Sequence, residues 1–98
     1  MIQKIKTNFI KKMSQHNDII DKLTIDFLKK HPHYDINQQY EPFLYTPLMI
    51  AAKNNDQDLV KFLLKKKNIN ARKKNKFGET VLVFMIRHNN REMIKLLS

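Results

Sequence analysis

The same helix-start signal occurs twice in this chain at a fixed spacing. Thr46 has the side chain of a helix N-cap, and Pro47 follows at the first helical position, where its missing N–H costs nothing. A second start, Thr80-Val81-Leu82, has Thr80 34 residues after Thr46. Other residues also coincide at this offset: Asn55 with Asn89, Asp58 with Glu92, and Leu59, Val60 and Leu63 with Met93, Ile94 and Leu97. A period of this size predicts stacked repeats, each a helical hairpin.

The repeated pattern resembles the ankyrin repeat. That family has a Gly-x-Thr-Pro-Leu-His-x-Ala-Ala start, a Gly turn, an Ile-Val-x-Leu-Leu-Leu second helix and an Asp-Val-Asn-Ala exit. The matching segments here are residues 46–52, 59–64 and 69–71, and the second copy keeps Gly78, Thr80, Leu82 and residues 93–97. The resemblance covers residues 45–97. It implies an all-α ankyrin-repeat solenoid of about three stacked helix-turn-helix hairpins with short β-hairpin fingers, and it implies protein binding without catalysis.

The chain departs from the family pattern at several positions. Met49 and Val83 stand where the family has histidine, and Asn55 and Asn89 replace the turn glycine. Asn tolerates a left-handed backbone better than other non-Gly residues, so the turns should survive this exchange. In the last hairpin Met85 and Ile86 replace the two small alanines, which predicts an altered terminal stack.

We expect a single domain over residues 1–98, because 98 residues form only a modest core. It divides into a degenerate first repeat (1–37), a central repeat (38–71) and a last repeat without a clear cap (72–98). Residues 1–13 carry an apolar stripe at helical spacing among lysines. This pattern suits the first helix of a degenerate repeat, and a membrane-surface helix or targeting peptide is the alternative. A second helix is predicted over Asp18–Lys30, capped by Asn17.

Composition narrows the function classes. The chain has no cysteine, which excludes disulfides and Cys-based metal sites and fits an intracellular protein, in the cytoplasm of the producing cell or of a host. No apolar run reaches membrane-spanning length. The net charge of +10 suits binding of nucleic acid or of an acidic protein. Codon usage is a further explanation, because Lys, Asn and Ile are all abundant and all have A/T-rich codons.

Nothing in the sequence indicates an enzyme, a cofactor or a metal. No Ser-His-acid spacing or Gly-rich phosphate loop is present. His31 and His33 supply only two metal ligands of the three or more that a site needs, and loop histidines are usually solvated. We therefore expect no catalytic residue and no metal ligand.

The sequence favours a protein-interaction module with a basic and aromatic surface. The candidate partner contacts are Tyr40, Arg72, Lys74 and Lys76 on the fingers and Lys53, Arg87 and His88 on the first helices of the hairpins. Tyr40 is expected to be exposed, whereas Phe43 and Tyr45 are equally suited to contacting a partner or to packing inward. An acidic protein is the favoured partner, nonspecific nucleic-acid binding through the lysine-rich surface is the alternative, and a solvated lysine loop is the functionless explanation.

The last helix retains an apolar side. Met93, Ile94, Leu96 and Leu97 would normally be covered by another repeat or by a polar cap. The sequence therefore predicts an apolar end that is exposed, covered by a partner, used for self-association, or continued in a longer array.

Overall fold

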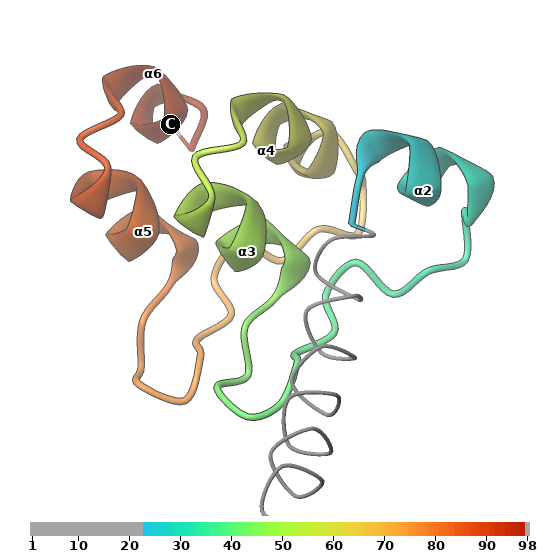
Figure 1. Cartoon of the computed structure of the whole chain (residues 1–98), viewed down its shortest axis with the longest axis horizontal. Coiled ribbons are helices and arrows are strands. Elements are labelled where there is room, and N and C mark those ends of the chain that lie inside the picture. Colours follow the sequence, from blue (N-terminus) through green and yellow to red (C-terminus); the bar gives the residue numbers. More distant parts are fainter. Residues whose placement is uncertain (1–22, 98) are drawn as a thin grey trace, which may run out of the picture.

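The computed structural model describes residues 23–97, which form two rows of short helices with loops projecting from one side (Figure 1). The helices are α2 (Ile25–Lys30), α3 (Pro47–Lys53), α4 (Gln57–Leu64), α5 (Val81–Arg87) and α6 (Arg91–Lys95). Helices α2, α4 and α6 form the outer row, and α3 and α5 form the inner row, next to the loops. Pairs α3–α4 and α5–α6 are the two hairpins that the 34-residue spacing predicts.

Side-chain caps begin most of these helices. The Thr46 hydroxyl accepts from the Met49 N–H at 3.2 Å, and Pro47 takes the first helical position, as predicted. Asp56 caps α4 in the same way, and Asn90 caps α6. Thr80 keeps the extended backbone of an N-cap but makes no side-chain cap bond. Four of the five starts are therefore fixed by a side chain that accepts a hydrogen bond from the first turn.

The two Asn turns adopt the predicted left-handed backbone. The φ angle of Asn55 is 55° and that of Asn89 is 52°, each directly between the helices of a hairpin. Asn occupies this region more readily than other side-chain-bearing residues, which explains how the hairpins turn without glycine.

The start of α2 differs from the predicted helix over Asp18–Lys30. Thr24 has an extended backbone, and its hydroxyl accepts from the Phe27 N–H at 3.1 Å, so the helix begins at Ile25. Because a cap residue lies outside the helix that it caps, α2 does not include Thr24. Asn17 and the helix predicted over residues 1–13 lie outside the described part of the chain.

Helix α3 forms the centre of the core. Its residues Pro47 to Ala52 are all buried, and it contacts both its own hairpin partner α4 and the next inner helix α5. Ala51 and Ala52 are small enough to let α5 approach closely. The core continues through Leu59, Val60 and Leu63 of α4 and Phe84, Met85 and Met93 of the last hairpin.

The last hairpin leaves an apolar face open. Leu48 and Ala52 of α3 are almost completely buried, but Leu82 and Ile86, 34 residues later, are 38% and 58% exposed. Met85 is fully buried, so the replacement of the two alanines has opposite results at the two positions. We call Leu82 and Ile86 the open face.

The predicted fingers follow a hairpin course with little β structure. The first finger has one isolated bridge between Tyr40 and Tyr45, and it is the only bridge in the described part of the chain. The Tyr40 N–H donates to the Tyr45 carbonyl at 2.8 Å. The second finger is joined to the first by the Lys76 N–H, which donates to the Phe43 carbonyl at 2.9 Å. The two fingers therefore lie side by side (Figure 1). None of the described helices is long and apolar enough to cross a bilayer.

Equivalent positions of the two hairpins should respond differently to substitution. Ala52→Ile places in α3 the residue that α5 has, and it should reduce the free energy of unfolding by about 1–3 kcal/mol because the site is packed. Ile86→Ala should change it by no more than about 0.5 kcal/mol, because Ile86 is exposed. Urea denaturation followed by circular dichroism measures both. Equal losses in the two variants would contradict the assignment of α5 as the outermost inner helix.

Candidate functional site

Four aromatic side chains form a row from the finger tips to α5. The ring centroids of Phe77 and Phe43 are 5.6 Å apart, and those of Phe43 and Tyr45 are 5.9 Å apart. Tyr45 meets Phe84 edge to face at 5.5 Å. These separations are typical of interacting aromatic pairs. We call these four residues the aromatic row; it joins both fingers to the inner row of helices.

Exposure increases along the aromatic row toward the finger tips. Phe84 is buried and Tyr45 is half-buried, whereas Phe43 is 44% and Phe77 59% exposed. A single exposed Phe is common on protein surfaces, but two in contact form a local apolar patch. The row is therefore anchored in the core at one end and open to solvent at the other.

Two cations lie along the inner part of the aromatic row. Lys53 Nζ lies 5.2 Å from the centroid of the Tyr45 ring, and the Arg87 guanidinium lies 5.4 Å from that of Phe84. Lys53 is the last residue of α3 and Arg87 the last of α5. Cations near an aromatic face are attracted by the ring quadrupole, so both side chains are held beside the row.

The buried side chain of Asn75 holds the tip of the second finger. Its Oδ1 accepts from the backbone N–H groups of Phe77 and Glu79 at 2.9 and 3.0 Å, and its Nδ2 donates to Glu79 Oε1 at 3.0 Å. Gly78 supplies the left-handed backbone that closes the turn, with φ of 75°. Phe77 is therefore presented on a braced turn.

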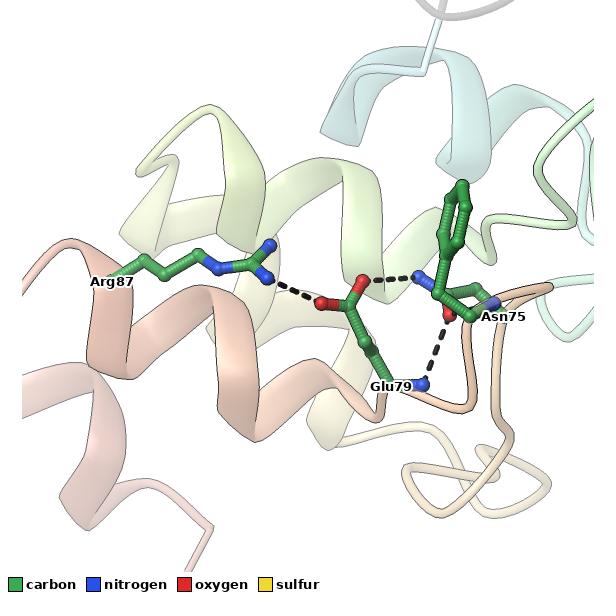
Figure 2. A network of polar contacts seen from close by, with 4 residues as sticks. Asn75, Glu79 and Arg87 are labelled. Atoms are coloured by element: carbon green, nitrogen blue, oxygen red, sulfur yellow. Dashed lines mark hydrogen bonds and ion pairs between the residues drawn. The ribbon is translucent and has the colours of Figure 1, made fainter.

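Glu79 connects this turn to α5. Figure 2 shows its carboxylate between Asn75 and Arg87, with which it forms an ion pair. The hydrogen bond from the Asn75 amide has the largest effect and lowers the pKa of Glu79; desolvation opposes it, and the Arg87 guanidinium lowers the pKa further. The carboxylate fixes Arg87 and partly neutralises it.

The expected exposure of Tyr40 is wrong. Its side chain is only 8% exposed, and its hydroxyl is hydrogen-bonded to that of Tyr34. Burial, followed by this hydrogen bond, raises the pKa of Tyr40. The residue holds the first finger against the exit loop of the preceding repeat, a contact that local sequence does not reveal.

The other predicted contacts are exposed but lie in different places. Lys53, Arg87 and His88 lie together at the ends of α3 and α5, where His88 Nε2 donates to the Lys53 carbonyl at 2.6 Å. Lys74 and Lys76 lie in the second finger beside Asn75 and Phe77. Arg72 lies earlier, in the exit turn after α4, where its N–H donates to Asn70 Oδ1 at 3.0 Å. The structure thus places Lys53 and Arg87 against rings of the aromatic row, with His88 bonded to Lys53. Lys74 and Lys76 are close to Phe77 in sequence, and Arg72 lies farther along the chain.

The sequence left the role of Phe43 open and did not indicate Phe77, Asn75 or Glu79 as site residues. The repeat spacing contains a signal for the first two, because Phe43 and Phe77 are 34 residues apart. Leu44 and Gly78 are separated by the same interval, and both have a left-handed backbone, with φ of 59° and 75°. Applying the offset to the fingers as well as to the helices would have placed the two Phe side chains at equivalent tips.

His31 is engaged by its neighbours in sequence. His31 Nδ1 donates to the Phe27 carbonyl at 2.9 Å, and its ring stacks on that of Phe27. Within residues 23–97 no three His or acidic side chains gather as metal ligands would. A cavity of about 350 Å³ beside His31 is lined mainly by Leu28, Tyr34, Phe62 and Lys66. Its lining is a mixture of apolar and basic side chains.

Removing the Glu79 carboxylate should weaken the fold in a pH-dependent way. Because the pKa of Glu79 is lowered from 4.5 in the folded chain, its stabilising effect is present above that pH and lost as the pH falls. Glu79→Gln should therefore melt at a lower temperature than the wild type at pH 7, and the gap should narrow at pH 3. Glu41→Gln, at the exposed tip of the first finger, is the control and should show no such change. An equal gap at both pH values would show that the charge of Glu79 is irrelevant.

Comparisons with known proteins agree with this geometry. The family model for ankyrin repeats, in three copies, matches residues 10–98. No curated protein matches the chain in sequence. A solved structure is similar with a TM-score of 0.66 and 32% identity: the ankyrin-like immunity protein in the complex "Bd0816 Predatory Endopeptidase from Bdellovibrio bacteriovorus in complex with immunity protein Bd3460". The match covers 84% of this chain and 43% of that one. The chain belongs to the ankyrin-repeat family.

Proposed function

We propose that this chain is a non-catalytic protein-interaction module whose partner contacts the fingers and the inner helices α3 and α5. The observation that carries the proposal is the aromatic row, which connects the exposed finger tips to α5. Large rigid side chains give contact area with little loss of conformational entropy, which is why aromatic residues dominate interface energetics. Lys53 and Arg87 add charge beside the row.

A protein partner is supported by the family and by the similar structure. Ankyrin repeats are protein–protein interaction modules. The similar immunity protein was solved in complex with an endopeptidase. Because this chain spans less than half of that protein, we transfer only the class of partner, a protein.

The charge of the surface favours an acidic partner. In the described part of the chain, Arg87 and Glu79 form the only ion pair. Within that part, no acidic side chain forms an ion pair with Lys53, Lys74 or Lys76. Such charges steer association with a surface of opposite sign, and the effect weakens with salt. Nonspecific binding of nucleic acid is the alternative, and it predicts a steep salt dependence. It is less well supported, because exposed Glu41 lies at the tip of the first finger and would repel a continuous phosphate backbone.

The proposal also covers where the chain acts and how it is divided into repeats. The chain acts inside a cell, in the cytoplasm of its producer or of a host, as one domain with repeat boundaries near residues 37 and 71.

The open face, with Leu82 and Ile86 exposed, supports self-association at that end. Sedimentation equilibrium of the wild type and of Ile86→Lys would test this, since the substitution should shift any dimer to monomer.

Reversing the charges near the aromatic row should weaken the binding of peptides to the chain. The probe is a phage-displayed library of random 16-residue peptides, selected on the wild-type chain. Lys53→Glu/Arg87→Glu and Lys74→Glu/Lys76→Glu should each reduce phage recovery at least tenfold. Lys61→Glu/Lys65→Glu, which makes the same charge change on and after α4, should leave recovery unchanged.

The controls separate folding from binding and protein from nucleic acid. Thermal unfolding shows whether each variant is folded, and the binding of a labelled 20-base-pair DNA duplex is measured in parallel at about 150 mM salt. Failure of the wild type to select any peptide, together with tight DNA binding, would contradict the proposal. Equal loss in all three charge variants would show that only total charge matters.

A further inference from the structure

Two features of the finger tips are not explained by folding. Phe43 and Phe77 are on different fingers, yet their rings are in contact and both remain largely exposed. The fingers are also tied together by the Lys76 N–H to the Phe43 carbonyl, which fixes the spacing of the two rings. An exposed aromatic pair costs solvation free energy in the free protein, so it is a feature that binding would relieve.

The turn that presents Phe77 is held by side-chain hydrogen bonds. Asn75 is buried and satisfies the N–H groups of Phe77 and Glu79, and Glu79 is in turn held by Arg87 (Figure 2). A braced aromatic side chain loses little freedom on binding, which makes it a more effective anchor than a flexible one.

We propose that the Phe43–Phe77 pair is the anchor point for an apolar side chain in an acidic segment of the protein partner, with Lys53, Lys74 and Lys76 facing carboxylates on either side of that apolar residue. The inference rests on the proposed function and deepens it by naming the chemistry of the partner. The rings supply the apolar contact, and the flanking lysines select acidic neighbours.

Single-stranded nucleic acid is the competing occupant, because aromatic rings stack on bases and lysines attract phosphates. Charge at the first finger tip favours a protein segment, because exposed Glu41 lies two residues before Phe43 and interrupts the positive charge there. A protein segment can have acidic residues beside the lysines and none beside Glu41, whereas a nucleic acid has a negative charge at every nucleotide.

The test uses the random 16-residue phage library on three baits. These are the wild type, Phe43→Ser/Phe77→Ser, and Ile86→Ser, whose substituted residue is exposed to the same degree as Phe77 but belongs to the open face. Peptides selected by the wild type should combine acids with a central aromatic or aliphatic residue. The affinity of such a peptide, measured by fluorescence anisotropy, should fall at least tenfold for the double Phe variant and for a peptide with Ser at its apolar position. It should be unchanged for Ile86→Ser.

Each other outcome overturns the inference in a distinguishable way. In one outcome, the selected peptides still bind Phe43→Ser/Phe77→Ser but no longer bind Lys53→Glu/Arg87→Glu. This would leave the proposed function intact and place the contact on the inner helices. Selected peptides without an apolar residue would reduce the interaction to charge. Binding of labelled (dT)20 that depends on the two Phe side chains, with no peptide selected, would assign the pair to nucleic acid and contradict both proposals. Single variants Phe43→Ser and Phe77→Ser replace the double variant if thermal unfolding shows that it is not folded.

Discussion

The burial of α3 is the constraint on which the rest of the structure depends. Every residue from Pro47 to Ala52 is removed from solvent, because α4 covers one side and α5 another. Short helices of this length are unstable alone, so their stability comes from tertiary packing. The packing of α5 against α3 sets the distance between neighbouring repeats. That distance in turn places the two fingers side by side and brings Tyr45 against Phe84, which creates the aromatic row.

The sequence predicted the helical hairpins well because their signals are local. Thr46 caps its helix through a residue only three positions away, and Asn55 and Asn89 adopt the backbone that their side chains tolerate. The prediction for the start of α2 is wrong, because Thr24 lies within the apolar pattern and caps the helix there. Local capping competes with hydrophobic periodicity, and at this end of the helix the cap decides where the helix begins.

The candidate site was less predictable because its contacts join residues far apart in the chain. Tyr40 was expected on the surface, but it is buried against Tyr34 of the exit loop. Arg87 was counted as an available cation, yet Glu79 pairs with it across eight residues. Phe43 and Phe77 meet only because the fingers of adjacent repeats align, which requires the stacking distance as well as the sequence. The repeat offset could have indicated their equivalence, but not their exposure.

Partner binding is proposed to occur on the fingers and the inner helices. The most direct test is a two-dimensional ¹H–¹⁵N NMR titration of the labelled chain with a peptide selected by phage display. Amide shifts should concentrate in residues 40–45 and 74–79 and at the ends of α3 and α5. Shifts concentrated on the outer helices α4 and α6, with the fingers unchanged, would contradict it.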